Sequence, residues 1–182
     1  MNMNHPTTSA GYLIGWLTDE SLVERVIELL VSEAGPEYAS HSDLMEGRAE
    51  KPGKWAPDIE QVLAREFESL ELSDSAFAGP GTRIAVATNG SQLVGFAVVA
   101  HVLVDAGPEK QIRFGRIDDI IVRPEFRSAG VGTALMAWVE TRLSEGGVTR
   151  LFLESGIGNQ GAHEFFARCG FNQVSLTMLK HI

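Results

Sequence analysis

Apolar residues recur along this chain with two different periods, which predict helices in some segments and strands in others. A spacing of three and four residues, which puts apolar side chains on one helix face, occurs in several segments. These segments lie at residues 22–30, 59–70, 131–143 and 162–169. Asp19 and Asn159 precede the first and the last of them and are residue types that cap helices. Gly35-Pro36 follows the first segment and should end that helix.

Short apolar runs bounded by turn residues predict the strands. They lie at residues 11–17, 83–88, 92–104, 111–122, 150–154 and 174–180. Asn89-Gly90 is a tight-turn pair and residues 105–110 form a second turn, so the second, third and fourth strands should be antiparallel neighbours. The helix after the fourth strand should be a right-handed crossover that makes the fourth and fifth strands parallel. The resulting order, β-α-α-β-β-β-α-β-α-β, predicts an α+β fold with a mixed, mostly antiparallel central sheet.

The composition fits one globular domain. With 182 residues, a single domain is expected at residues 11–182, after a disordered tail at residues 1–10. The sequence has no apolar run long enough to span a membrane, and its first residues lack the basic and apolar parts of a signal peptide. The single cysteine, Cys169, excludes an internal disulfide, and without a Cys/His cluster no metal site is expected. We therefore expect a cytoplasmic protein with no metal cofactor.

The net charge of −9 and the pI of about 5.0 narrow the range of partners. A nucleic-acid-binding domain usually carries a basic patch, so this balance argues against one. A negative field favours cationic substrates such as amines. The alternative is that the charge serves solubility alone.

The strand that ends at residue 122 leads into a glycine loop and then into a helix. Arg127, Gly130 and Gly132 stand where the loop becomes the helix. Glycine lets a ligand approach the backbone closely, and the first amides of a helix are free to bind an anion such as pyrophosphate. A P-loop would need a lysine after its second glycine, and a dinucleotide-binding fingerprint would need a third glycine. A dinucleotide-binding fold is therefore a weaker alternative, and an ordinary glycine-rich turn is another.

Two motifs in this chain resemble those of the GCN5-related N-acetyltransferase (GNAT) superfamily. Arg127-x-x-Gly130-x-Gly132 resembles its acyl-CoA loop, whose pattern is Gln/Arg-x-x-Gly-x-Gly/Ala. Residues 151–171 resemble its second CoA motif, a strand followed by Asn-x-x-Ala-x-x-Phe-Tyr-x-x-x-Gly-Phe. The resemblance covers residues 82–182, and the part before it agrees only in the order of elements. It implies a GNAT-like sheet with helices on both faces.

The resemblance also implies that acetyl-CoA is the co-substrate, and it assigns residues to its binding. The pantetheine arm would pair with the backbone of Ile120, Ile121 and Val122, and the pyrophosphate would lie on the amides of the glycine loop. The loop residues are Arg127, Ser128, Ala129, Gly130, Val131, Gly132 and Thr133. The second motif adds Asn159 and Phe166. The guanidinium of Arg127 would make charge-assisted contacts with phosphate, unless it is simply a surface residue.

Acetyl transfer to a primary amine needs a neutral amine and a donor for the developing oxyanion. Asp118 and Asp119 lie near the end of the binding strand, where members of the superfamily often carry a carboxylate. Because side chains alternate along a strand, at most one of the two faces the acceptor. Glu154, at the end of the next strand, is the other candidate. Salt bridges or strand-end solvation are the alternative roles for all three.

The leaving thiolate also benefits from a proton, and here the sequence departs from the superfamily. Phe166 stands where the superfamily has its tyrosine, and a phenylalanine has no proton to give. Ser155, Cys169 or water would then protonate the sulfur. Alternatively the thiolate leaves unaided, which a thiol pKa near 8.5 makes feasible.

Residues 36–56 lack a periodic pattern and are expected to form a long irregular loop, which in a compact domain is often functional. In the resembled fold this segment forms a wall of the acceptor site. Its candidate lining residues are Tyr38, His41 and Trp55, with charge from Glu37, Asp43 and Glu46. The alternative is a solvated loop anchored by one or two aromatic residues.

The expected function is acetyl-CoA-dependent N-acetylation of a small cationic amine, aminoglycoside-like or polyamine-like, by direct attack on the thioester. A peptide or protein amine is an alternative acceptor. A non-catalytic acyl-CoA-binding regulatory module is the alternative that Phe166 keeps open. We expect no nucleic-acid or membrane partner, and the predicted C-terminal strand could pair with a neighbour to give a homodimer.

Overall fold

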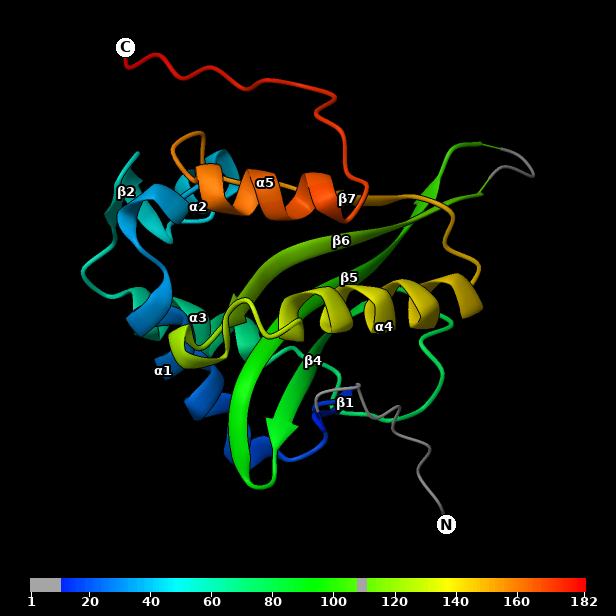
Figure 1. The fold of residues 1–182 in the computed structure, drawn as a ribbon. Helices are drawn as coiled ribbons and strands as arrows, with labels where there is room; N and C mark the ends of the chain where they lie inside the picture. The colour runs from blue at the N-terminus through cyan, green and yellow to red at the C-terminus, as the bar shows by residue number, and fades with distance from the viewer. Residues whose placement is uncertain (1–10, 108–110) are drawn as a thin grey trace.

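The computed structural model describes residues 11–107 and 111–182, which fold around a five-stranded sheet (Figure 1). In spatial order the strands are β1 (Leu13–Trp16), β4 (Gly81–Asn89), β5 (Gln92–Asp105), β6 (Gln111–Val122) and β7 (Leu151–Leu153). Neighbouring strands are antiparallel except β6 and β7, which are parallel. The predicted antiparallel run and the parallel crossover are both confirmed.

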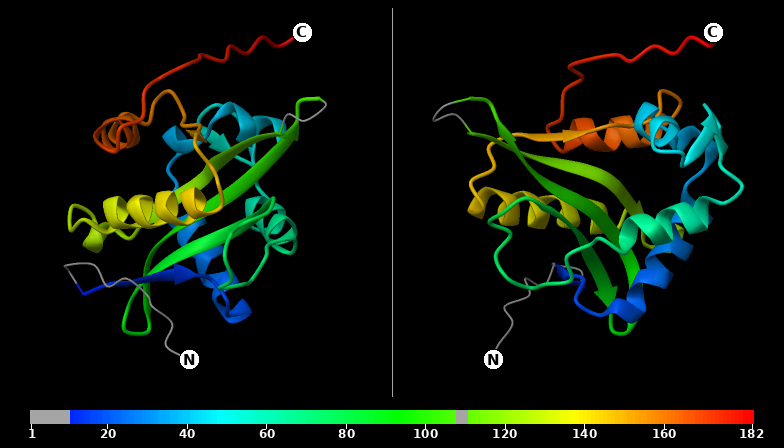
Figure 2. Two further views of the ribbon diagram at one scale, coloured as in Figure 1. Left: turned by 90° about the vertical axis from the view of Figure 1, so that its right-hand side faces the viewer. Right: turned by 180° about the vertical axis from the view of Figure 1, so that it is seen from behind.

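Helices cover both faces of this sheet, as expected (Figure 2). On one face α1 (Val23–Glu33) and α3 (Ile59–Phe67) share a buried cluster with Phe96. On the other face α4 (Val131–Glu145) packs through Leu135 and Val139 into a second buried cluster. α5 (Gln160–Arg168) lies on the same side of the sheet as α4. The predicted α+β fold with a mixed, mostly antiparallel sheet is confirmed.

Local sequence signals place several element ends where the pattern predicted them. The carboxylate of Asp19 accepts a hydrogen bond from Ser21 N at 3.0 Å and caps the helical turn Glu20–Leu22 that leads into α1. α1 ends just before Gly35-Pro36, as expected. Gly90 adopts a φ of 58°, which the tight turn between β4 and β5 requires.

The prediction of an irregular loop at residues 36–56 is wrong, because the segment forms short elements of its own. They are the helical turn Pro36–Tyr38, α2 (His41–Met45), β2 (Ala49–Lys51) and β3 (Lys54–Trp55). Ser40 and Asp43 form a capping box that starts α2, with Ser40 N donating to Asp43 Oδ2 at 2.7 Å. The indole of Trp55 donates to the carbonyl oxygen of Ala34 at 2.8 Å and ties the β2–β3 hairpin to the end of α1.

The predicted C-terminal strand at residues 174–180 is also wrong, because residues 171–182 carry neither a helix nor a strand. The apolar side chains that suggested it, including Val174, Leu176 and Met178, are exposed. An alternating pattern forms a strand only when an edge is available to pair with. β7 is the edge on that side and is short, and the tail leaves α5 in a direction away from it (Figure 1).

Two further expectations concern residues beyond this description. The predicted disordered tail at residues 1–10, and residues 108–110 of the predicted turn between β5 and β6, lie outside the described residues. Across the described ranges the structure contains no helix with both the length and the apolar character needed to cross a membrane.

Candidate active site

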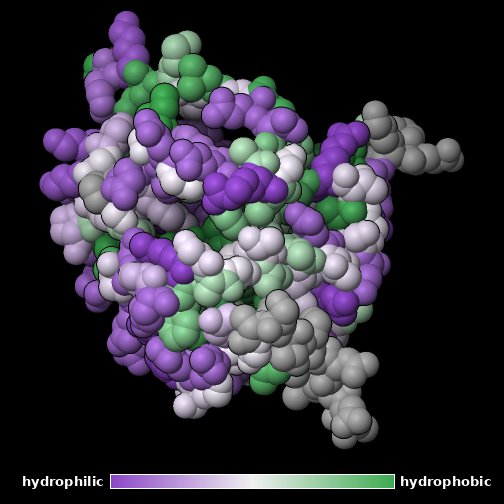
Figure 3. Space-filling view, in the orientation of Figure 1, coloured by the Kyte–Doolittle hydropathy of each residue, from purple (hydrophilic) through white to green (hydrophobic). Residues whose placement is uncertain are grey.

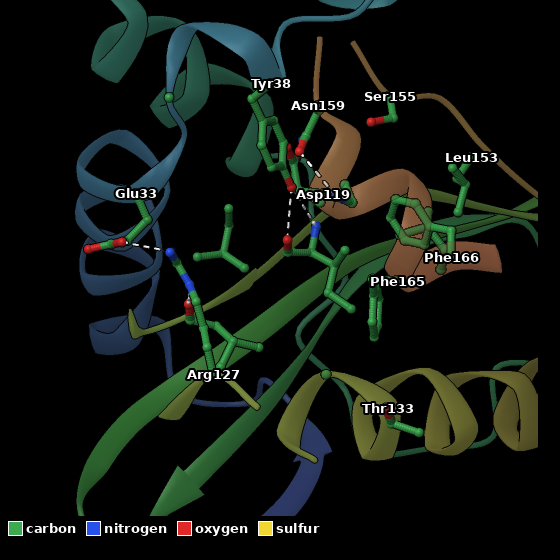
Figure 4. Close-up of a pocket in the computed structure, with 18 of the residues that line it drawn as sticks. Glu33, Tyr38, Asp119, Arg127, Thr133, Leu153, Ser155, Asn159, Phe165 and Phe166 are labelled. Carbon is green, nitrogen blue, oxygen red and sulfur yellow. Dashed lines mark hydrogen bonds and ion pairs between the residues drawn. The ribbon is translucent and has the colours of Figure 1, made fainter. Parts of the chain in front are cut away.

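A cavity of about 690 Å³ opens where β6 runs on past its pairing with β7. The two strands pair over residues 115–117, and the rest of β6 forms one wall of the cavity. The glycine loop, the start of α4, α5 and residues 33–38 form the other walls (Figure 4). In the space-filling view, apolar surface lies in the hollow between α5 and α4, with hydrophilic residues around it (Figure 3).

The glycine loop and the start of α4 form one end of this cavity. Gly130 has a φ of 82° and is the N-cap of α4, and Ser128 before it also has a positive φ, of 62°. Among the described residues no side chain caps this N-terminus, and the first turn of α4 carries no acidic residue. A β-carbon at Gly132 would lie 3.3 Å from the ring of Phe165, so glycine keeps this wall open. Free amides at a helix N-terminus with no competing carboxylate suit a pyrophosphate.

Arg127 lies at the rim of the cavity and already has two partners. Its Nε donates to the carbonyl oxygen of Val122 at 2.9 Å, and its Nη2 lies 2.8 Å from Glu33 Oε2 on α1. The Arg127 side chain is 52% exposed, so part of the guanidinium faces solvent beside the glycine loop. The guanidinium of Arg127 is therefore held close to the glycine loop without being buried.

A β-bulge in β6 lies at Asp118, directly before Asp119. Ile117 pairs with Val99 and Asp119 with Val98, so Asp118 is the extra residue on β6. The carboxylate of Asp118 accepts hydrogen bonds from Arg116 and lines the cavity. Asp119 also contributes to the wall of this cavity, but it is only 4% exposed and its carboxylate is paired with Arg48. The expectation that at most one of the two faces the acceptor assumed strict alternation, which the bulge interrupts, so it stays a prediction.

The carboxylate of Asp119 belongs to a buried cluster around Arg48, a residue that the sequence did not single out. Arg48 Nη1 lies 3.1 Å from Asp119 Oδ2 and 3.7 Å from Asp43 Oδ1, and its Nη2 lies 2.5 Å from Glu66 Oε2. Burial raises the pKa of Asp119 to about 6, although Arg48 acts to lower it. The cluster joins α2, α3 and β6, which marks Asp119 as a structural carboxylate.

Tyr38 contacts the backbone of β6 inside the cavity. Its hydroxyl donates to the carbonyl oxygen of Ile120 at 2.8 Å and accepts from Ile120 N at 3.2 Å (Figure 4). These are the main-chain groups that the sequence assigned to the pantetheine arm. An acyl arm that pairs with Ile120 must therefore take the place of this hydroxyl.

A second, smaller cavity of about 60 Å³ adjoins the first one. Both are lined by Tyr38, Ile117, Asp118 and Glu154. Glu154 Oε2 lies 3.1 Å from His41 Nδ1 at the start of α2. The Oγ atom of the neighbouring Ser155 is buried without a hydrogen-bond partner among the described residues.

The second predicted CoA motif forms α5 and the wall above β6. Asn159 Oδ1 accepts a hydrogen bond from Ala162 N at 3.2 Å, which confirms its predicted role as the cap of α5. Phe166 is 8% exposed, and its ring lies 5.3 Å from that of Phe165 and 5.9 Å from that of Phe171. The position that departs from the superfamily pattern is thus an aromatic packing site that also lines the cavity.

All the predicted catalytic and CoA-binding residues line the larger cavity except Ala129 and Val131. Ala129 is exposed on the loop. Val131, the first residue of α4, points into the buried core. Of the predicted acceptor-wall residues, Trp55 packs with the α1–α3 cluster instead. Within residues 11–107 and 111–182, no group of three or more His, Cys, Asp or Glu side chains is placed to hold a metal ion.

A mixed sheet in which free helix amides lie beside an unpaired strand edge is the arrangement of an acyl-CoA-dependent acyltransferase. Residues 48–171 match the sequence model of the acetyltransferase (GNAT) family, and the chain belongs to this family. The resemblance found in the sequence is therefore confirmed, as is the expectation of an enzyme of this family. Acetyl-CoA is the co-substrate that the family uses.

Individual proteins that resemble this chain share about a third of its residues or fewer over the matched regions. An aminoalkylphosphonate N-acetyltransferase from Salmonella typhimurium is 32% identical over 66 residues, which span 36% of this chain and 43% of that protein. An aminoglycoside N(6')-acetyltransferase type 1 from Stenotrophomonas maltophilia is 29% identical over 124 residues, 67% of this chain and 75% of that protein. The crystal structure of a transcriptional regulator from Bacillus halodurans superposes with a TM-score of 0.66 at 16% identity, covering 94% of this chain and 99% of that one. At that identity the superposition shows the fold alone.

Proposed function

We propose that this chain transfers the acetyl group of acetyl-CoA to a primary amine of a small cationic acceptor, aminoglycoside-like or polyamine-like. The observation that carries the proposal is that the second cavity is acidic and shares a wall with the first. Its carboxylates are Asp43, Glu46, Asp118 and Glu154. Its guanidiniums, on Arg48 and Arg116, are themselves bonded to carboxylates. An ammonium group placed there lies next to the strand at which the acyl donor is held.

The larger cavity supports the donor half of the proposal. The uncapped amides at the start of α4 and the guanidinium of Arg127 lie at one end and suit the pyrophosphate. The edge of β6 at Ile120 has no strand neighbour on the β7 side and leads from there towards the acidic cavity. Once the Tyr38 hydroxyl gives way, this edge suits an extended arm that pairs as a strand would. The thioester then lies at the boundary between the two cavities.

Glu154 is the carboxylate that best suits the proton transfer from the amine. It lines both cavities and is 42% exposed, so it reaches the acceptor and can pass a proton on to solvent. Asp118 is engaged by Arg116, and Asp119 is buried and engaged by Arg48. Loss of a proton to Glu154 leaves the neutral amine free to attack the thioester directly. Ile120 N–H then faces the oxygen that becomes the oxyanion.

The aminoglycoside N(6')-acetyltransferase relative, which matches 67% of this chain, supports a polycationic acceptor. The test is release of free CoA from acetyl-CoA in the presence of an amine panel. The panel should contain polyamines, aminoglycosides, peptides with a free N-terminus or lysine, and a neutral amine of similar size. We expect turnover with polycations and little with the neutral amine. A preference for peptides would instead favour the protein-acetylating alternative.

Measuring whether acetyl-CoA binds separates this proposal from a non-catalytic regulatory module and from a dinucleotide-binding protein. A ligand that binds only the folded state raises the stability by about 2.7 kcal/mol at a hundred times its dissociation constant. Thermal unfolding should therefore shift with acetyl-CoA and with CoA but not with NAD. A shift with acetyl-CoA without CoA release for any amine would favour a regulatory module. No shift at millimolar acetyl-CoA would overturn the assignment of the larger cavity.

A further inference from the structure

The reaction centre needs a hydroxyl that Phe166 does not provide. Within the described residues, the hydroxyl side chains that line the larger cavity are Tyr38, Ser128, Thr133 and Ser155. Ser128 belongs to the glycine loop and Thr133 to the first turn of α4, which place them at the phosphate end. Tyr38 and Ser155 remain as groups at the acyl end.

The hydroxyl of Tyr38 lies at the peptide group that receives the acyl arm under the proposed function. It is 2.8 Å from Ile120 O and 3.2 Å from Ile120 N. A thioester oxygen that accepts from Ile120 N displaces the hydroxyl from this amide but leaves it next to the reacting carbon and sulfur. Tyr38 also lines both cavities, so its ring stands where the donor and the acceptor meet.

The backbone around Tyr38 is fixed in this position by a glycine after β7. Gly156 N donates to the carbonyl oxygen of Tyr38 at 3.3 Å. A β-carbon at Gly156 would lie 2.3 Å from the carbonyl oxygen of Glu37 and 2.6 Å from that of Ala39. A side chain at position 156 is therefore incompatible with the present path of residues 37–39. The close approach brings a tyrosine from the early part of the chain to the cavity that Phe166 also lines.

We propose that Tyr38 donates a hydrogen bond from its hydroxyl to the departing sulfur, and so performs the role for which the second CoA motif of this chain has no side chain. The inference rests on the proposed function. The amine nitrogen forms the new C–N bond, and its protons pass to Glu154 and solvent. As the C–S bond breaks, the electron pair goes to sulfur, and the Tyr38 O–H stabilises the thiolate. The thiolate takes its proton from water after it leaves.

The surroundings of Tyr38 keep its hydroxyl protonated. Burial raises the pKa of Tyr38, and the negative charge of Asp119 raises it further. A phenol with a raised pKa holds its proton at neutral pH and acts as a hydrogen-bond donor. A thiol with an ordinary pKa near 8.5 forms a thiolate that needs only this partial neutralisation.

The test is Tyr38→Phe, which keeps the ring and removes the hydroxyl. We expect kcat to fall by about 10²-fold, the low end of what a positioned proton donor contributes. The dissociation constant for acetyl-CoA, measured by calorimetry, should stay the same or fall, because the variant no longer competes for Ile120 N. A purely structural role would weaken binding and turnover together. Tyr12→Phe, which alters the other tyrosine in the β1 core, is the matched control and should keep full turnover.

A second variant tests whether a phenol supplied from another element can replace the hydroxyl of Tyr38. Adding Phe166→Tyr to Tyr38→Phe should raise kcat at least tenfold above that of Tyr38→Phe alone, because it supplies a phenol from the opposite wall. Full turnover in Tyr38→Phe, or a loss seen only in Ser155→Ala, would overturn the proposal. Wild-type protein that does not bind acetyl-CoA would instead overturn the proposed function, so the two failures are distinguishable.

Discussion

Glu154 Oε2 lies 3.1 Å from His41 Nδ1, so the end of β7 and the start of α2 are within ion-pair distance across the acidic cavity. The contact joins the wall of the larger cavity to a segment that the sequence pattern had suggested was a loop. It leaves Glu154 partly exposed, at 42%, and accessible from both cavities. This is the position that a base for the acceptor amine requires.

Replacing Glu154 with glutamine should therefore impair chemistry without impairing donor binding. Glu154→Gln keeps the shape of the side chain and removes its ability to accept a proton. We expect kcat/KM for the amine to fall by about 10²-fold. Calorimetry should show an unchanged affinity for acetyl-CoA. Glu140→Gln, on the exposed face of α4, makes the same change of charge and should keep full activity. Full activity in Glu154→Gln would move the role of base to Asp118 or to water.

The parts of this structure that the sequence predicts are those encoded by local interactions. Asp19 caps the turn before α1 through Ser21, two residues away, and Gly90 makes a turn between strands that are adjacent in the chain. The glycine loop is likewise a local signal, because the positive φ at Gly130 and the start of α4 lie within a few residues. Patterns of this kind placed the central strands, the main helices and the glycine loop.

Long-range contacts account for what the sequence did not reveal. Tyr38 and Ile120 are 82 residues apart, and Arg48 and Asp119 are 71 residues apart. Neither pair leaves a periodic trace, because each depends on where the fold brings the two segments. The predicted strand at residues 174–180 fails for the same physical reason. Its alternation describes one strand alone, whereas strand formation needs a partner edge.

Gly130→Glu should abolish acetyl-CoA binding by placing a carboxylate among the amides at the start of α4. Gly130 has a φ of 82°, so a side chain there also strains the backbone, by roughly 1–2 kcal/mol. Gly90→Glu provides the matched control, because Gly90 has a φ of 58° in the β4–β5 turn and, like Gly130, has no atom near its missing β-carbon. Both variants should lose similar stability in thermal unfolding, and only Gly130→Glu should lose binding in calorimetry. Unchanged binding in Gly130→Glu would show that the glycine loop is an ordinary turn.

Asp119→Asn should change how stability depends on pH. The folded-state pKa of Asp119 is raised from 3.8 to about 6, mainly by burial. Between these values the folded state binds more protons than the unfolded state, so this group lowers stability as pH rises through the window. At about 1.4 kcal/mol per pKa unit, the wild type should lose on the order of 3 kcal/mol relative to Asp119→Asn between pH 4 and pH 7.

Urea unfolding of both proteins at a series of pH values measures this difference. Asp74→Asn, which changes an exposed carboxylate on the loop between α3 and β4, corrects for the general effect of removing one charge. A stability difference between wild type and Asp119→Asn that stays constant across the window would show that Arg48 keeps Asp119 ionised throughout. Asp119 on β6 and Arg48 would then form a permanent ion pair.

Glu33→Gln should strengthen acetyl-CoA binding, because Glu33 competes with the pyrophosphate for Arg127. Arg127 Nη2 lies 2.8 Å from Glu33 Oε2, and both residues line the phosphate end of the cavity. An exposed ion pair contributes at most about 1 kcal/mol, so the gain should be no more than about fivefold in dissociation constant. Arg127→Gln should weaken binding, and its effect should shrink at high salt as charges are screened. Glu28→Gln, an exposed change on the same helix, is the control and should leave binding unchanged. Weaker binding in Glu33→Gln would mean that the ion pair positions Arg127 for the phosphate instead of competing with it.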